Sequence, residues 1–254
     1  MQESLSVTTG ALEPQARQRT LPAQVIGEFY HSDTSAADQV RHFLALSGED
    51  RARVVVDVGG GCGFFARGLA ARTAHSVRVV DTDPASIDAC GEAGVEATQG
   101  DALSPPIAGD EQVACLNLIL HHLVGRTDSE TRRLQREALA VWRPQAEAVF
   151  VNEYVYTSLA GDFSAWLIFQ VTSSRVLSAL AALVGRVVPT LRANTLGVGV
   201  RFRNHQGWLR LFEDAGYEVK RFEAGDPEGV FAARRLLLIR RIHRCSYWLE
   251  PRAA

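Results

Sequence analysis

Short apolar runs alternate with helical segments between residues 53 and 156 of this 254-residue chain. The runs are rich in valine and lie at 53–57, 77–81, 95–98, 113–119 and 148–156. Segments of helical character separate them at 63–73, 84–93 and 127–141. Apolar strands that alternate with helices pair in parallel and need cover on both faces. This order therefore predicts an α/β fold with a mostly parallel sheet.

The alternation stops near residue 157. Residues 157–204 show no strand pattern and contain two apolar helical stretches that end near Pro189. A helix at 205–216 and two strands, at 217–224 and 234–242, follow. The sequence thus predicts a Rossmann-like, seven-stranded sheet with a helical insertion between the fifth and sixth strands. Such an insertion lies near the strand ends where ligands bind in open α/β folds.

Composition excludes several classes of protein. Hydrophobic residues make up 46% of the chain and charged residues 22%, unlike disordered or fibrous proteins. The net charge of -2 argues against a nucleic-acid binder. The 4 cysteines have no C-x-x-C spacing, which favours reduced thiols, no metal site and a cytoplasmic location. Since no signal peptide and no uninterrupted membrane-spanning run is evident, we expect no membrane partner.

The stretch DVGGGCG, Asp57 to Gly63, follows the first apolar run directly and precedes a helical segment. Its glycines permit positive φ and close approach of a ligand, and the helix N-terminus adds N–H groups. Such a loop alone also fits a tight connection that binds nothing. The next strand, however, ends in Asp81, whose carboxylate can accept hydrogen bonds from both hydroxyls of a ribose. Together the two features predict a nucleoside site.

The spacing within the glycine loop distinguishes two classes of cofactor. Dinucleotide sites use G-x-G-x-x-G, whereas this chain has D-x-G-x-G-x-G. The acid before the first glycine suits a ligand with a positive charge and an ammonium group better than a pyrophosphate. A nicotinamide dinucleotide is the alternative. Asp83, which precedes Pro84, fits the role of helix N-cap better than Asp81 does.

These residues resemble the class I S-adenosylmethionine-dependent methyltransferases. The resemblance lies in four motifs, in order: VVVDVGGGCGFFARGLA, VRVVDTDPASID, QGDAL and DEQVACLNLILHHL. It covers residues 50–155 well and 205–240 loosely. It implies methyltransferase activity with S-adenosylmethionine as cofactor. The cofactor-binding residues that it implies are Asp57, Gly59, Gly61, Gly63, Asp81, Thr82, Asp101, Ala102, Leu118 and, in an N-terminal lid, Tyr30.

In these terms the chain divides into four regions. An N-terminal arm and helical lid is expected over 1–50, and the S-adenosylmethionine-binding core over 51–156. A helical substrate cap over 157–204 follows, and 205–254 complete the core.

Acid and base candidates follow the fourth and fifth strands, where a methyl acceptor would bind. LHHL supplies His121 and His122, of which at most one should face the cleft, with His121 preferred. VNEYVY supplies Glu153, an acid that is costly to bury without a purpose. Either residue could instead have a structural role, with the histidine bonded to a backbone carbonyl and Glu153 paired with an arginine. The residues expected to contact the acceptor are Tyr154, Asn152, Arg201 and Arg203.

The insertion favours a small-molecule acceptor, because it should enclose the site rather than leave a groove for a polymer. Oxygen is the favoured acceptor atom, since LHH and the flanking elements resemble small-molecule O-methyltransferases, and specialised metabolism is the expected context. N- or C-methylation of a small molecule and a non-catalytic S-adenosylmethionine-binding protein stay open. The apolar helices at 163–187 predict either a homodimer interface or part of the core.

Overall fold

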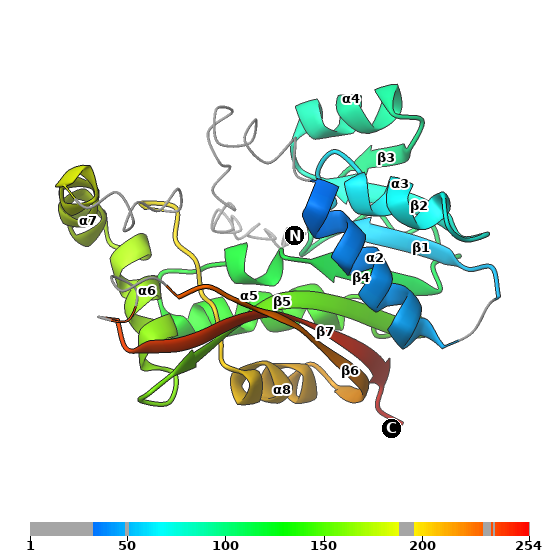
Figure 1. Cartoon of the computed structure of the whole chain (residues 1–254). Coiled ribbons are helices and arrows are strands. Elements are labelled where there is room, and N and C mark those ends of the chain that lie inside the picture. The colour runs from blue at the N-terminus through cyan, green and yellow to red at the C-terminus, as the bar shows by residue number, and fades with distance from the viewer. Residues whose placement is uncertain (1–32, 49–50, 188–195, 231–234, 236, 254) are drawn as a thin grey trace, which may run out of the picture.

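A computed structural model describes residues 33–48, 51–187, 196–230, 235 and 237–253. Its centre is a 7-stranded sheet with the strand order β3-β2-β1-β4-β5-β7-β6 (Figure 1). The strands are β1 (Val54–Val58), β2 (Ser76–Asp81), β3 (Glu96–Gln99), β4 (Val113–Asn117), β5 (Ala148–Ser158), β6 (Tyr217–Glu228) and β7 (Ile239–Pro251). The strands from β3 to β5 run parallel, and β7 is antiparallel to β5 and β6. The predicted fold class is therefore confirmed.

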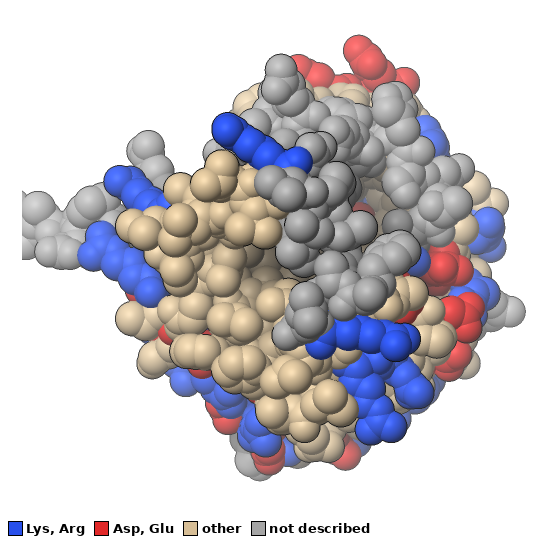
Figure 2. Space-filling view, turned by 60° about the vertical axis from the view of Figure 1, so that its left-hand side comes forward, with Lys and Arg blue, Asp and Glu red and all other residues tan. Residues whose placement is uncertain are grey.

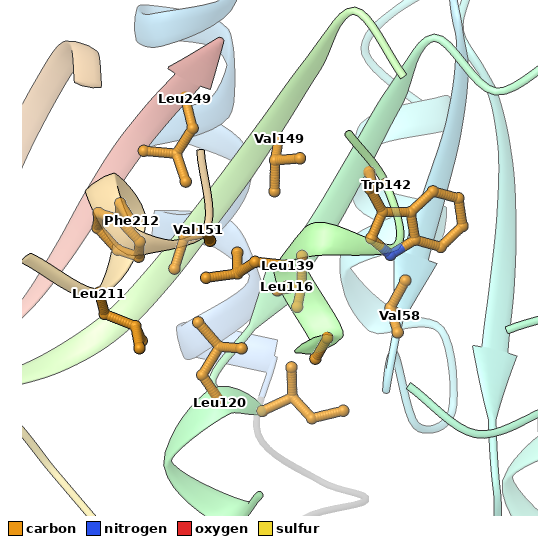
Figure 3. Packing of buried hydrophobic residues seen from close by; sticks show 14 of the residues in the cluster. Val58, Leu116, Leu120, Leu139, Trp142, Val149, Val151, Leu211, Phe212 and Leu249 are labelled. Atoms are coloured by element: carbon orange, nitrogen blue, oxygen red, sulfur yellow. The ribbon is translucent and has the colours of Figure 1, made fainter. Parts of the chain in front are cut away.

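Helices cover both faces of this sheet (Figure 1). They are α2 (Asp33–Ser47), α3 (Phe64–Ala70), α4 (Pro84–Glu92), α5 (Asp128–Ala140), α6 (Phe163–Ser173), α7 (Arg175–Val187) and α8 (His205–Asp214), with a short 3-10 helix η1 (Leu120–His122). Successive strand residues face opposite sides, so Val149 and Phe150 join different hydrophobic clusters. One cluster packs α2 and α3 on the sheet. The other packs α5 and α8 on the opposite face and includes Leu139 and Phe212 (Figure 3).

The helical segment expected before the first strand is α2, which packs on the sheet through Phe43. This ring is fully buried, and its centroid lies 5.3 Å from that of Phe150 and 5.8 Å from that of Trp248. We expect Phe43→Ala to lower the free energy of unfolding by about 3–5 kcal/mol, because it leaves a cavity among aromatic rings. Urea denaturation measures this change. Leu44→Ala, at an exposed position one residue on, is the matched control and should change stability little. Equal losses in the two variants would show that α2 does not pack as described.

The last strand lies further along the chain than the sequence predicted. The pattern RRLLLIRRI indicated a strand at 234–242, but β7 spans Ile239–Pro251. Its central residues, Tyr247 to Leu249, are buried between β5 and β6. The prediction stopped too early because His243 and Arg244, which follow Ile242, interrupt the apolar pattern. Both side chains are half-buried in a strand that continues to Pro251.

The helical insertion between the fifth and sixth strands is confirmed as α6 and α7, which lie beyond one end of the sheet (Figure 1). After the insertion the chain runs beside β5, where Tyr156 N donates to Arg203 O at 3.1 Å. Arg201 N likewise donates to His121 O at 2.9 Å. The returning segment is thereby attached to the ends of β4 and β5. No single described helix has the length and apolar composition to cross a membrane, and only α6 and α7 taken together, bent by 100°, pass that test.

Candidate active site

The glycine loop connects β1 to α3. Gly59, Gly61 and Gly63 all have positive φ, at 70°, 53° and 73°, which explains why no other residue type fits easily. A Cβ added at Gly59 would run into the side chain of Ile119, which follows β4. A Cβ added at Gly61 would meet no atom within 4 Å. The loop is thus packed against the β4 end on one side and leaves open space beside Gly61.

Asp57 is fully buried at the end of β1 beside this loop. Its Oδ1 accepts a hydrogen bond from Asn117 Nδ2 at 2.9 Å. Burial raises the pKa of Asp57 to about 7, Asn117 opposes this shift, and the charge of Asp81 adds to it. Asp57 Oδ2 and Asn117 Oδ1 are buried and have no hydrogen-bond partner among the described residues. Two adjacent acceptors without donors mark a place for a ligand that carries N–H groups.

Asn117 was missed in the sequence analysis. It is the last residue of β4 and a polar residue in the apolar run VACLNLI. That interruption was the available signal. Only the sheet register shows that Asn117 reaches across to Asp57 on the neighbouring strand.

Asp81 ends β2 and binds the glycine loop. Its Oδ2 accepts from Gly61 N and its Oδ1 from Asp83 N, each at 2.9 Å. Asp83 is the N-cap of α4 and accepts from Ser86 N at 3.1 Å, so the two neighbouring carboxylates have separate roles. Each oxygen of Asp81 has a single donor among the described residues, which leaves both with lone pairs for further hydrogen bonds. The half-buried Thr82 lies between the two acids.

Asp101 and Ala102 follow β3 at the same edge of the sheet. Asp101 is half-buried, and its Oδ1 accepts from Leu103 N at 2.8 Å, which holds the turn. Ala102 belongs to the buried core beside Val80. Both residues therefore lie at the sheet edge that carries the glycine loop and Asp81.

Leu118 is strained at the end of β4. It has a φ of 55°, although leucine rarely adopts the left-handed region, and its N–H donates to Asn152 O at 2.8 Å. The strand was predicted to continue to residue 119, but this conformation ends it at Asn117 and directs the chain into η1. Backbone strain of this kind gathers at functional sites.

His121 and Glu153 form a buried pair between η1 and β5. His121 Nδ1 lies 2.8 Å from Glu153 Oε2, and His121 N donates to Glu153 Oε1 at 3.2 Å. Tyr154 N also donates to Oε2, so the carboxylate accepts from three groups, and no arginine of the described residues pairs with it. A carboxylate at Nδ1 selects the tautomer with the proton on Nδ1. The Nε2 atom of His121 then carries a free lone pair and has no partner among the described residues.

His122 differs from its neighbour. Its ring centroid lies 4.1 Å from that of His121. Burial, and then the charge of His121, lower the pKa of His122 well below its usual value. His122 is therefore held neutral, and no carboxylate orients it in the described structure.

An aromatic cluster borders His121 on the returning segment. Phe202 stacks on His121 with centroids 4.8 Å apart and on Tyr156 with centroids 4.5 Å apart. Tyr154 contacts both His121 and Phe202 edge-on. Burial raises the pKa of Tyr154, and Glu228 adds to this effect, so its phenol keeps its proton. The sequence analysis missed Phe202, because it stands alone between two arginines.

The other predicted acceptor contacts are engaged inside the protein. Arg201 is buried, and its guanidinium binds Asp128 and Asp162 at 2.5 and 2.6 Å. Arg203 donates from Nε to Gln135 at 2.9 Å, while burial and then Arg201 lower the pKa of Arg203 to about 10. Asn152 is buried on the α2 side of the sheet and donates to Ser246 at 2.7 Å.

Tyr30, the predicted lid residue, lies outside the described residues.

Comparisons with known proteins identify the fold. No protein-family model matches the sequence, and no curated protein matches it. The solved MccD protein superposes with a TM-score of 0.59 at 10% identity, covering 85% of this chain and 96% of that chain. Geranyl diphosphate methyltransferase in complex with SAM gives 0.55 at 12% identity, with coverage of 91% and 90%. The chain has the class I methyltransferase fold.

A class I methyltransferase fold does not by itself identify a reaction. The [4+2]-cyclase SpnF also superposes, with a TM-score of 0.52 at 15% identity over 86% of this chain and 80% of that chain. Proteins of this architecture can therefore be named for chemistry other than methyl transfer. Function has to be argued from the residues of the site.

Proposed function

We propose that the protein is an S-adenosylmethionine-dependent methyltransferase that methylates a hydroxyl oxygen of a small, flat acceptor in specialised metabolism. The observation that carries the proposal is the His121–Glu153 pair, which presents a free imidazole nitrogen at the end of β4. The same end of the neighbouring strand carries the glycine loop, and Ile119 packs between the two. A candidate base and the glycine loop thus follow neighbouring strands at the same end of the sheet.

The residues present fit S-adenosylmethionine. The open backbone at Gly61 can lie against its methionine part, and the carboxylate of Asp81 can accept from its ribose hydroxyls. The buried acceptors of Asp57 and Asn117 suit its ammonium group, which donates hydrogen bonds and carries positive charge. Asp101 and the backbone of Ala102 would border the adenine. The nicotinamide alternative lacks support in this loop, whose spacing and acid do not suit a pyrophosphate.

The bound cofactor supplies a methyl group on a positively charged sulfur, which needs no further activation. The protein then has to hold the acceptor in line, exclude water and remove one proton. His121 Nε2 would accept the hydroxyl proton of an acceptor that is held in line with this methyl group. Glu153 holds the ring and stabilises the imidazolium that results. Because Glu153 is fully buried, this stabilisation is weakly screened by water.

The side chains around His121 favour a flat, apolar acceptor. Phe202, Tyr154 and Tyr156 provide ring faces and edges. Arg201 is already neutralised by two carboxylates, so it offers little attraction to an acidic acceptor. Many nitrogen and carbon acceptors would also have to lose a proton. Identifying the methylated atom by mass spectrometry distinguishes them from oxygen acceptors.

Two measurements test this function. Calorimetry with S-adenosylhomocysteine and with NAD identifies the cofactor class. Incubation with deuterium-methyl-labelled S-adenosylmethionine and a panel of phenols, aromatic amines and apolar carbon acids then identifies the acceptor atom by mass spectrometry. We expect S-adenosylhomocysteine binding and labelled methyl ethers. Cofactor binding without any labelled product over a broad panel would support a non-catalytic binding protein instead.

The affinity for S-adenosylhomocysteine should depend on pH through Asp57. In the free protein the pKa of Asp57 is about 7, so this acid is largely protonated below neutral pH. An ammonium group beside it favours the carboxylate, so binding must release a proton at low pH. We expect the affinity to rise about eightfold from pH 6 to 7.5 and then level off. Titration calorimetry in buffers of different ionisation enthalpy measures both the affinity and the released proton.

Asp57→Asn is the control for this pH dependence. It keeps a side chain of the same shape but cannot ionise, so its weaker affinity should be constant over the same range. A slope that persists in Asp57→Asn would assign the proton to another group.

A further inference from the structure

The helical insertion carries an exposed apolar face. Val176, Leu177, Leu180, Leu183 and Val184 of α7 are 41% to 69% exposed. At about 100° per residue they fall within an arc of about 120° on one side of the helix. On the opposite side, Ser178 is buried and donates to Val171 O of α6 at 2.7 Å. The helix therefore contacts α6 through Ser178 and presents its large apolar residues outward.

The neighbouring helix α6 also exposes a large apolar side chain. Trp166 is 42% exposed, whereas Trp142, Trp208 and Trp248, which complete the 4 tryptophans, are buried. Figure 2 shows a broad uncharged area on this side of the molecule, with Lys and Arg side chains at its edges. Exposed apolar patches of this kind mark interaction surfaces in soluble proteins.

The charged side chains within α6 and α7 are all basic. Between Phe163 and Val187 the charged residues are Arg175 and Arg186, at the two ends of α7, and neither has an ion pair among the described residues. Exposed arginines at 235, 240 and 241 lie near the start of α6, where Ser164 Oγ donates to Leu237 O. The acids that border this region, Asp162 and Glu228, are engaged by Arg201 and Arg244.

We propose that the α6–α7 face docks on an anionic lipid surface. An amphipathic helix with large apolar residues on one side and arginines off that side lies in the plane of a membrane interface. Anionic headgroups attract such arginines. A second copy fits less well, because residues 163–187 contain no carboxylate that could pair with Arg175 or Arg186 of a neighbouring copy. The absence of a spanning helix, on which the expectation of no membrane partner rested, does not bear on docking at a surface.

Trp166 provides the readout in the full-length protein. Vesicles of phosphatidylcholine with phosphatidylglycerol should shift its fluorescence to the blue, and phosphatidylcholine alone should not. Raising the salt concentration should weaken binding, because the attraction of surface charges is screened. The Trp166→Phe variant should still bind the vesicles but show no fluorescence shift. Its binding is measured by vesicle flotation instead.

Variants test the two halves of the surface. Leu180→Glu should lower vesicle affinity at least about tenfold, since it places a carboxylate in the apolar face. The double variant Arg175→Gln/Arg186→Gln should lower it about 25-fold, at roughly fivefold for each arginine. Leu44→Glu on α2 and Arg72→Gln after α3, both exposed and distant in the fold, are the matched controls and should bind as the wild type does. Thermal melting confirms that each variant is folded.

Several results would overturn the proposal. Equal binding to neutral and anionic vesicles would show that the arginines do not attract the lipid. The absence of binding to either kind of vesicle would show that the face does not dock on a membrane. A dimer by light scattering that Leu180→Glu dissociates, without vesicle binding, would assign the face to a second copy. None of these results depends on methyltransferase activity, so failure here leaves the proposed function standing.

Discussion

Replacing His121 with asparagine should lower kcat by about a hundredfold to ten-thousandfold, the range that a positioned general base contributes. The asparagine amide can occupy the place of Nδ1 and still donate to the buried carboxylate of Glu153. The variant thus removes Nε2 without leaving Glu153 unpaired, which would destabilise the fold. The rate is measured with whichever phenol of the panel is methylated. Affinity for S-adenosylhomocysteine should be unchanged, since the base does not hold the cofactor.

His122→Asn is the matched control. His122 is held neutral by burial and lacks a carboxylate partner among the described residues, so we expect only a small change in kcat. Equal losses of kcat in both variants would indicate that the histidines act through packing. A His121→Asn variant with unchanged kcat would show that His121 is not the general base.

Replacing Asp81 with alanine should weaken S-adenosylhomocysteine binding about a hundredfold, because hydrogen bonds to a charged group contribute roughly 1.5–3 kcal/mol each. The carboxylate has two tasks. It would accept from the ribose hydroxyls, and it holds the glycine loop through Gly61 N. Titration calorimetry measures the affinity.

Asp83→Ala separates cofactor binding from folding. This neighbouring carboxylate caps α4, so its loss should cost about 1 kcal/mol of stability and leave the affinity unchanged. If Asp83→Ala weakened binding as much as Asp81→Ala, the effect would come from the loop between them, and the ribose contact would be wrong.

Much of the fold could be predicted from local patterns. The alternation of valine-rich runs with helices depends on short-range periodicity, and the structure confirms a mostly parallel sheet with an inserted helical pair. The error in β7 has a physical cause. In a strand that extends past the core, many positions face solvent, and charged residues there interrupt the alternation of apolar and polar side chains.

The candidate site was predictable only in part. Glycines with positive φ, the acid that ends β2 and the histidines after β4 each have a local signature. Phe202 has none, and the polar interruption at Asn117 does not reveal its partner, because the partners of both residues are distant in the sequence. The same is true of Arg201, which the sequence could only place near the cap and which the structure pairs with Asp128 and Asp162.

The sequence by itself determined the order of the strands and helices, the backbone conformation of the glycine loop and the position of acids at strand ends, because these depend on neighbouring residues. Tertiary structure alone decided which side chains meet. The pairing of His121 with Glu153, the unpartnered acceptors of Asp57 and Asn117, and the outward face of α7 depend on contacts between strands and helices far apart in the chain. Such contacts follow from sheet register and packing, which no local pattern encodes.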